Sequence, residues 1–183
     1  MKFEVEQKYR VADEAVLIRR IAELGGTPED ARLEVDQYFT HPARNFAKTD
    51  EALRIRTREG EQFVTYKGPK IDQTTKTRRE IEIPLSTEAN ARRDFADLLE
   101  ALGFAKHAVV RKRRRKFELS WEGAEIEGAL DEVESVGTFV ELEILAEESA
   151  VDEAKRRLKS LAEKLGLEAS ERRSYLELLL ERQ

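Results

Sequence analysis

The sequence predicts an α+β protein in which an antiparallel sheet turns one apolar face toward amphipathic helices. Apolar and charged residues alternate with a period of two in several segments, which is typical of half-buried strands. A helical period is confined to a few other segments. Short turn signals such as Glu59-Gly60 join neighbouring strand segments, and this favours antiparallel pairing.

The strand segments share one pattern, with apolar residues on one face and ionisable residues on the other. The alternating sets are Phe3 and Val5 with Glu4, Glu6 and Lys8; Leu53 and Ile55 with Arg54 and Arg56; Ile81 and Ile83 with Glu80 and Glu82; Phe117, Leu119 and Trp121 with Glu118; and Val140 and Leu142 with Glu141 and Glu143. We expect the apolar face of each strand to pack against the helices.

The expected helices each carry an apolar stripe that we interpret as core packing. The first follows Asp13, with the apolar stripe Leu17, Ile21 and Leu24, and the second follows Ser86 or Thr87, with the stripe Phe95, Leu98, Leu99 and Leu102. The third begins at Ser149, with the stripe Val151, Ala154, Leu158, Leu161 and Leu165, and a short fourth helix follows Ser170. Glycines end the first three, at Gly25, Gly103 and Gly166.

Length and composition indicate a single domain over residues 1–183, because no stretch rich in Pro, Gly or Ser divides the chain. The sequence contains no cysteine, which excludes disulfides, thiolate nucleophiles and cysteine-ligated zinc. His41 and His107 lack the spacing of a metal site. A net charge of −5 argues against a general nucleic-acid binder. The start of the chain has no apolar signal core and no apolar run is long enough to span a membrane, so we expect a cytoplasmic enzyme or binding protein.

The polar face of the predicted sheet is almost entirely ionisable if the alternation is followed strictly. It collects Glu4, Glu6, Lys8, Arg54, Arg56, Lys67, Arg78, Glu80, Glu82, Lys112, Arg114, Asp131, Glu141 and Glu143. The simple alternative is a flat sheet whose charged face is solvated. Two features argue against it: surface strands more often carry Thr, Ser and Gln, and a sheet of this size tends to curl or close.

Charges enclosed by a curled sheet require partners, because a dry carboxylate or guanidinium group must be paired or bound. The arginines and lysines of this face suit phosphate oxygens. The carboxylates suit a hard divalent ion, Mg²⁺ or Mn²⁺, that bridges to phosphate. The charged face therefore predicts a site for a polyanion with a metal.

The basic run from Arg111 to Lys116 has two interpretations. It could be a localisation or nucleic-acid patch, but its apolar flanks indicate a strand with alternate cations on opposite faces. If Phe117 packs against the helices, Lys112 and Arg114 point to the charged face. A register shifted by one would place Arg111 and Arg113 there instead.

An ordered set of motifs resembles the CYTH superfamily, the triphosphate tunnel metalloenzymes, and within it the class IV adenylyl cyclases. Glu4-Val5-Glu6-Gln7-Lys8 matches the ExExK pattern. Further matches are Val35-Asp36-Gln37-Tyr38-Phe39, Leu53-Arg54-Ile55-Arg56, Thr65-Tyr66-Lys67-Gly68-Pro69, Arg78-Arg79-Glu80-Ile81-Glu82, Leu130-Asp131-Glu132-Val133, the segment from Gly137 to Glu143, and Ser174-Tyr175-Leu176. The resemblance spans essentially the whole chain. It implies a closed or nearly closed antiparallel barrel of about eight strands, a tunnel with flanking helices.

The resemblance also implies roles for the charged residues. Metal ligands would be Glu4, Glu6, Glu141 and Glu143, with Asp131 as a candidate fifth; catalytic residues would be Glu4, Glu6, Lys8 and Asp131; and the triphosphate would be bound by Lys8, Arg54, Arg56, Lys67, Arg78, Lys112 and Arg114. The cofactor would be Mg²⁺ or Mn²⁺.

The resemblance implies an enzyme that acts on a small triphosphate. We favour an adenylyl cyclase that converts ATP to cAMP and pyrophosphate, because the QYF, GTF-ELE and SYLELL segments resemble that branch most closely. The alternative is a triphosphatase that hydrolyses inorganic or thiamine triphosphate. A second alternative is a nucleotide- or polyphosphate-binding module without turnover. A homodimer is the oligomeric state that the resemblance suggests.

Overall fold

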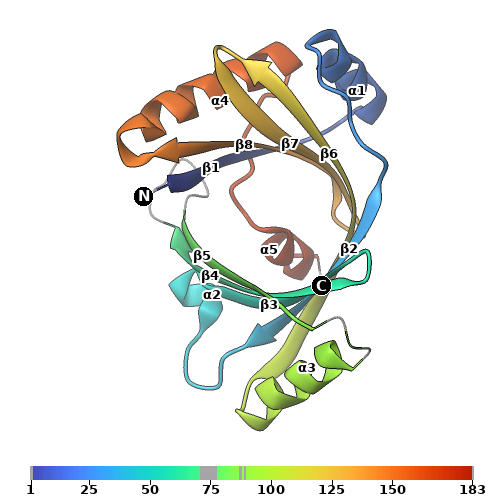
Figure 1. Cartoon of the computed structure of the whole chain (residues 1–183), viewed down its shortest axis with the longest axis vertical. Helices are drawn as coiled ribbons and strands as arrows, with labels where there is room; N and C mark the ends of the chain where they lie inside the picture. Colours follow the sequence, from blue (N-terminus) through green and yellow to red (C-terminus); the bar gives the residue numbers. More distant parts are fainter. Residues whose placement is uncertain (1, 71–77, 87, 89, 183) are drawn as a thin grey trace.

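Eight antiparallel strands form one curled sheet around a central tunnel in the computed structural model, which describes residues 2–70, 78–86, 88 and 90–182 (Figure 1). The strands follow the order β1-β8-β7-β6-β2-β3-β4-β5 across the sheet. Their bounds are β1 Lys2–Arg10, β2 Arg32–Thr40, β3 Ala52–Arg58, β4 Glu61–Lys70, β5 Arg78–Pro84, β6 Ala105–Trp121, β7 Ala124–Val133 and β8 Gly137–Glu147.

The sheet is a nearly closed barrel. Strands β1 and β5 are its two edges, and no ladder joins them in the part of the chain that the structure describes. The predicted α+β fold, a nearly closed antiparallel tunnel of about eight strands with flanking helices, is confirmed.

Two tight hairpin turns hold consecutive strands in register. Glu59 and Gly60 join β3 to β4, and Glu122 and Gly123 join β6 to β7; all four residues have positive φ, between 48° and 86°. This is the backbone of a type I′ turn, whose twist matches that of the strands it joins. The turn predicted at Glu59-Gly60 is thus confirmed, and it produces the antiparallel pairing of β3 with β4.

Five α-helices surround the sheet in the described part of the chain: α1 Glu14–Glu23, α2 Phe46–Thr49, α3 Ala91–Ala101, α4 Val151–Leu165 and α5 Tyr175–Leu180, with a 3₁₀ turn at Glu148–Ala150 before α4. Asp13 caps α1 as predicted, because its carboxylate accepts from the Val16 amide at 3.0 Å. The start expected for α3 is wrong: the helix begins after Asn90, later than Ser86, while Thr87 lies outside the described residues.

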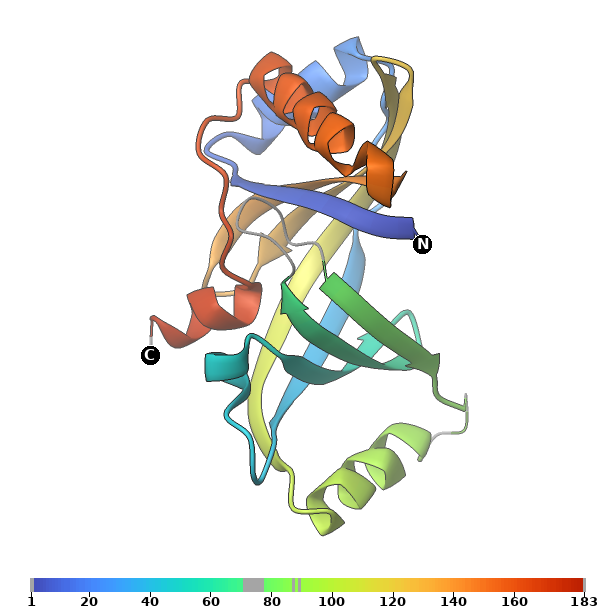
Figure 2. The ribbon, with the colours of Figure 1, turned by 90° about the vertical axis from the view of Figure 1, so that its left-hand side faces the viewer.

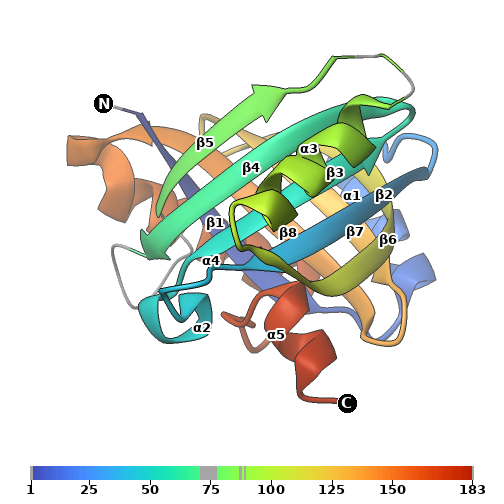
Figure 3. The ribbon, with the colours of Figure 1, turned by 90° about the horizontal axis from the view of Figure 1, so that it is seen from below.

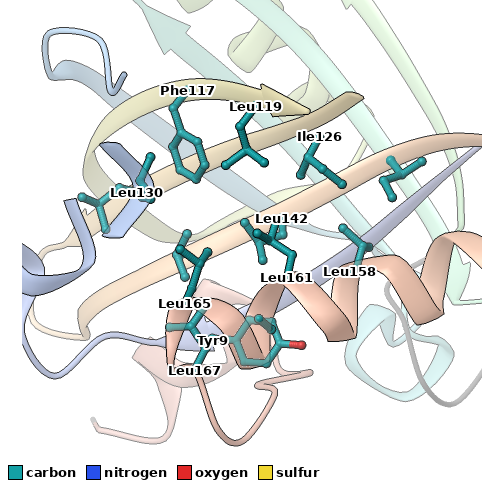
Figure 4. Packing of buried hydrophobic residues seen from close by; sticks show 14 of the residues in the cluster. Tyr9, Phe117, Leu119, Ile126, Leu130, Leu142, Leu158, Leu161, Leu165 and Leu167 are labelled. Carbon is teal, nitrogen blue, oxygen red and sulfur yellow. The ribbon is translucent and has the colours of Figure 1, made fainter. Parts of the chain in front are cut away.

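The main core lies between the sheet and helices α4 and α1 (Figure 4). Phe117, Leu119 and Leu142 from the strands pack with Leu158 and Leu161 from α4, all almost fully buried. The predicted apolar faces of these strands and of α4 are therefore confirmed.

Gly128 on β7 has a specific role in this core. A Cβ atom at this position would lie 2.0 Å from the Phe117 ring. Only glycine leaves room for the ring, so the close packing of β6 on β7 depends on this residue.

A smaller core places α3 on the outside of β2, β3 and β4 (Figure 3). Ala96 and Leu99 of α3 pack with Phe39, Ile55 and Val64. Leu53 and Phe95 also pack against this cluster, but the expected packing is wrong for four other apolar residues of the region. In β5, Ile81 and Ile83 remain 40% and 56% exposed, because the cluster beneath α3 takes no residue from that edge strand. Leu98 in α3 and Leu102, which caps the end of the helix, are 51% and 63% exposed and take no part in that cluster.

Helix α5 lies across one end of the tunnel (Figures 1 and 2). Ser174 begins it with a capping box to Glu177. Tyr175 and Leu178 pack against buried residues from the sheet, Tyr38, Val110, Val133, Val136 and Phe139. None of the described helices has the length and apolar character needed to cross a membrane.

Candidate active site

The inner face of the sheet lines a cavity of about 860 Å³. Ten of the predicted site residues line it: Glu4, Glu6, Arg54, Arg56, Lys67, Arg78, Lys112, Arg114, Glu141 and Glu143. They come from six strands that are distant in sequence, β1, β3, β4, β5, β6 and β8. The alternative of a flat sheet with a solvated charged face is therefore wrong.

The basic strand has the register in which even-numbered residues face the cavity. Lys112 is 3% exposed and Arg114 15% exposed at their side chains, and both line the cavity. Arg113 lies on the other face, where its side chain is 64% exposed and its nearest carboxylate, Glu132, is 4.0 Å away. The alternation about Phe117 therefore predicted the direction of these side chains correctly.

Two predicted site residues lie behind the cavity rather than on it. Asp131 is fully buried and forms bonds only with neighbouring side chains in the described structure. Lys8 is 1% exposed; its Nζ donates to the Arg173 carbonyl at 2.5 Å and lies 4.1 Å from the centre of the Tyr175 ring. The chain that leads into α5 covers Lys8, so in this structure neither residue is placed to contact a ligand.

A buried carboxylate holds two arginines on one wall. Asp36, on β2, accepts from Arg56 Nε and Nη2, both at 2.7 Å, and from Arg54 Nη1 at 3.0 Å. Burial alone would raise the pKa of Asp36, but Arg54 and Arg56 outweigh it and hold the pKa well below its usual range. The carboxylate stays ionised and fixes the planes of both guanidinium groups.

Two further carboxylates, Asp131 and Glu34, hold the cations of β6. Asp131 accepts from Arg114 Nε at 2.7 Å and Nη2 at 2.5 Å, while Lys112 Nζ lies 3.2 Å from Glu34 and 3.4 Å from Asp131. Tyr175 of α5 donates its hydroxyl proton to Asp131 at 2.8 Å. Burial favours a higher pKa for Glu34, yet the charge of Lys112 and the neighbouring arginines lowers it to about 2.

The cations from β4 and β5 are less completely paired. Lys67 Nζ donates to Glu80, which also lies 3.6 Å from Arg78 Nε. The Nε atoms of Arg54 and Arg78 are buried and make no hydrogen bond to any residue that the structure describes. Burial and the charge of Arg54 lower the pKa of Lys67 to about 8. This part of the wall therefore has donors left for an anionic ligand.

The opposite wall gathers the carboxylates of β1 and β8: Glu4, Glu6, Glu141 and Glu143. Glu6, Glu143 and Glu127 are direct cross-strand neighbours on β1, β8 and β7. Burial raises the pKa of Glu143 to about 8, with Glu4 and Glu6 as further causes. The pKa of Glu4 is raised by burial and by Glu80. Like charges opposite one another in a sheet are destabilising, so this wall is complementary to a cation.

The donor set is oxygen alone, which matches the preference of Mg²⁺ and Mn²⁺. Within the described residues, no three carboxylates or histidines converge closely enough to form a complete metal site. One carboxylate, Glu141, also bonds Arg114 Nη2 at 2.5 Å. An ion on this wall would therefore need oxygens from a ligand as well as from the protein.

Sequence reasoning assigned no role to two of the buried carboxylates behind the cations, Glu34 and Asp36, although Asp36 lies in one of the matched motifs. Glu34 and Asp36 alternate with Val35 and Gln37, so the same period of two could have placed them on the charged face. Tyr175 was recognised only as part of a motif, yet it joins α5 to Asp131. Glu127 was also missed, although its strand carries Asp131 on the same face.

A family model for the CYTH domain matches residues 2–175. The chain belongs to the CYTH domain family. Relatives with assigned names agree with this membership. Adenylate cyclase CyaB of Aeromonas hydrophila is 31% identical over 182 residues, which is 95% of this chain and 87% of that protein. A Methanocaldococcus jannaschii protein, provisionally named an adenylate cyclase, is 37% identical over 180 residues, covering 96% of this chain and 97% of its own.

Solved structures show the same CYTH architecture. The PH1819 protein of Pyrococcus horikoshii superposes with a TM-score of 0.85 at 42% identity, covering 98% of this chain and 99% of its own. A Vibrio parahaemolyticus protein, also provisionally named an adenylate cyclase, gives 0.80 at 25% identity over 97% and 98% of the two chains. Both solved structures therefore share the fold of this chain over nearly its whole length.

Proposed function

We propose that this CYTH protein is a divalent-metal-dependent enzyme that acts on a triphosphate, with ATP as substrate and cAMP and pyrophosphate as products. One observation carries the proposal: a cationic wall and an acidic wall face each other across a single cavity. A triphosphate alone would be repelled by the carboxylates, and a metal ion alone by the arginines. Together they complement both walls.

The cationic wall would bind the phosphate chain. Arg54, Arg56, Lys67, Arg78 and Arg114 are the cavity-lining cations best placed to donate to phosphate oxygens, with Lys112 beside them. Because Asp36 and Asp131 already fix three of the arginines, little side-chain entropy is lost when the ligand binds.

The acidic wall would bind the metal ion through Glu4, Glu6, Glu141 and Glu143. When bound, the ion would offset the negative charge that develops on the phosphate oxygens during attack. Binding would also lower the pKa of Glu143, since the cation relieves repulsion among the carboxylates.

The surroundings of Asp131 and Lys8 support different roles from those that the resemblance implies. Asp131 would act as a positioning residue, because it aims Arg114 and holds Tyr175. Lys8 would anchor the chain before α5 through the Arg173 carbonyl. Neither would contact substrate in this conformation.

Cyclase and triphosphatase activity differ in the attacking oxygen, which is a ribose hydroxyl in one and water in the other. The names of the relatives favour the cyclase. Triphosphatase activity is the second candidate. A Hippeastrum protein with the same fold is 17% identical to this chain, with a TM-score of 0.69. That protein is provisionally named an adenylyl cyclase, and a dominant triphosphatase activity is described for it.

The decisive experiment is product identification. Purified protein is incubated with ATP or with inorganic triphosphate, with Mg²⁺ or Mn²⁺, and the products are identified by phosphorus NMR and chromatography. We expect cAMP and pyrophosphate from ATP. Orthophosphate would support the triphosphatase instead, and unchanged substrate in every mixture would contradict both and leave a binding module.

A further inference from the structure

Helix α5 contacts the cationic side of the tunnel through Tyr175, its first residue. Tyr175 is 8% exposed and lines the cavity, and its hydroxyl donates to Asp131 Oδ2 at 2.8 Å. Phenylalanine would fill the same space in the apolar cluster that Tyr175 shares with Phe139 and Leu178. Packing alone therefore does not explain the hydroxyl, which is bonded to a buried carboxylate of the site.

Asp131 connects this hydroxyl to Arg114. Its Oδ2 atom accepts from Tyr175 and also from Arg114 Nη2 at 2.5 Å, and its Oδ1 atom accepts from Arg114 Nε at 2.7 Å. The terminal torsion of an aspartate has broad energy minima, so the partners of the carboxylate set its plane. A donor from α5 and two donors from β6 fix that plane together, and the guanidinium group is aligned with it by two parallel bonds. The hydroxyl of Tyr175 thus contributes to the direction in which Arg114 points.

The ring and the hydroxyl of Tyr175 have different partners. Lys8 Nζ and Lys112 Nζ lie 4.1 Å and 5.3 Å from the ring centre, where the face of the ring attracts a cation. Phenylalanine would keep these contacts with the two lysines. Loss of the hydroxyl alone therefore isolates the bond to Asp131, and with it the orientation of Arg114.

Tyr175 is itself held in place at the start of α5. Ser174 and Glu177 form a capping box, in which the Glu177 amide donates to Ser174 Oγ at 3.1 Å and the Ser174 amide donates to Glu177 Oε2 at 2.6 Å. The ring of Phe139 packs beside the ring of Tyr175, with 5.3 Å between their centres. A side chain that orients a binding group needs a fixed position of this kind.

We infer that Tyr175 is a positioning residue of the triphosphate site, which acts through Asp131 to orient Arg114 and so makes phosphate binding depend on the docking of α5. The inference rests on the proposed triphosphate site and adds the residue that couples α5 to it. Tyr175 needs no bond of its own to the ligand, because its hydroxyl proton is already donated to Asp131.

The test uses Tyr175→Phe, which removes the hydroxyl and keeps the ring. The probe is bis-methylene triphosphate, an inorganic triphosphate whose two bridging oxygens are replaced by CH₂ groups, titrated calorimetrically with Mg²⁺ at fixed salt. Tyr9→Phe is the matched control, because it removes a tyrosine hydroxyl that donates to Gln7, from a residue buried in the main core. Circular dichroism and thermal unfolding verify that each variant is folded.

We expect Tyr175→Phe to weaken binding of the probe by about tenfold, which is typical for the loss of an outer bond that orients a binding group. Tyr9→Phe should change the affinity by less than about twofold. In an Arg114→Ala background, Tyr175→Phe should also change it by less than about twofold, because the side chain that Tyr175 orients is absent. A tenfold loss that persists in that background would show a purely structural role and overturn the inference. An unchanged affinity of Tyr175→Phe alone would overturn it as well.

A second measurement needs no ligand. The Arg114 Nε–H signal in ¹H–¹⁵N NMR spectra, identified by its absence from Arg114→Ala, reports the bond from this group to Asp131. We expect Tyr175→Phe to shift or broaden the signal and Tyr9→Phe to leave it unchanged. A signal that Tyr175→Phe does not affect would overturn the inference whether or not the probe binds. Wild-type protein that fails to bind the probe with Mg²⁺ would overturn the proposed function, so the two failures are distinguishable.

Discussion

The cationic wall and the acidic wall of the tunnel differ in the neighbours of their charged side chains. On the cationic wall, Arg54, Arg56 and Arg114 are each bonded to a buried carboxylate, Asp36 or Asp131. On the acidic wall, Glu143 faces Glu6 and Glu127 across the strands, and its pKa rises to about 8 because of burial and its neighbours. The contacts of the first wall pair each of these arginines with a carboxylate, whereas the second wall places carboxylates directly beside one another.

This difference indicates which wall depends on ligand. Removing a partner from a buried ion pair leaves an uncompensated charge, whereas removing one of several crowded carboxylates relieves repulsion. Substitutions on the cationic wall should therefore destabilise the fold. Substitutions on the acidic wall should remove activity without destabilising the fold. The four predictions below test this contrast.

The largest effect is expected for Glu4→Gln combined with Glu6→Gln. The amides keep the volume but lose the charge that a divalent ion requires, so turnover should fall by about a thousandfold. The melting temperature of the ligand-free protein should stay the same or rise. Turnover is measured by product formation and stability by thermal unfolding; wild-type turnover and metal dependence would contradict the metal-ligand assignment.

Asp36→Asn should destabilise the protein by about 3 kcal/mol, because Arg54 and Arg56 would lose the charge that neutralises them. Urea unfolding gives the free energy. Asp97→Asn, at an exposed position on α3, is the control and should change it by less than about 0.5 kcal/mol. A stability close to the wild-type value would show that the arginines do not need this carboxylate.

Arg114→Ala should weaken binding of a nonhydrolysable triphosphate by roughly tenfold to a hundredfold, since it removes a charge-assisted contact. Arg113→Ala should change the affinity little, because its side chain is 64% exposed on the outer face. Calorimetry at fixed salt measures both. If Arg113→Ala were the damaging change, the phosphate role would pass to the odd-numbered residues of β6.

The most gradual effect is the pH dependence set by Glu143, which is spread over several pH units. Its folded-state pKa of about 8 is above the usual value of about 4.5 for a glutamate, so its contribution to stability is complete below 4.5 and is lost as the pH rises through 8. The loss should amount to at most about 1.4 kcal/mol per pH unit. Mg²⁺ affinity should rise over the same interval, because the ion binds the ionised carboxylate. Thermal unfolding from pH 5 to 9 and Mg²⁺ titrations measure both trends, and Glu143→Gln should remove them; a flat wild-type profile would contradict the carboxylate repulsion.

Alternation in the sequence was enough to predict the curled sheet and most of its inner face. Lys112 and Arg114 face the cavity because a strand without a bulge between them and Phe117 preserves the period of two. The exposed Ile81 and Ile83 show where this reasoning ends. Alternation defines two faces, but it does not say which strand becomes an edge beyond the reach of a helix.

The two missed features of the site depend on contacts between distant parts of the chain. Lys8 has the right face and spacing, yet the segment around Arg173 covers it, at a separation of 165 residues. Asp36 has the right spacing too, but only the strand order, with β2 beside β3, places it against Arg54 and Arg56. Such pairings are set by topology and cannot be read from the local pattern.

The two edges of the sheet would give a bound triphosphate a structural role. Strand β1 supplies Glu4 and Glu6 and strand β5 supplies Arg78, yet no ladder joins these edges in the part of the chain described. Glu80 on β5 raises the pKa of Glu4 on β1, so charges interact across the gap. A metal-bound triphosphate held by both edges would crosslink them and complete the circumference of the barrel. With the ligand bound, the barrel would be closed, and the substrate would form the connection between its two edge strands.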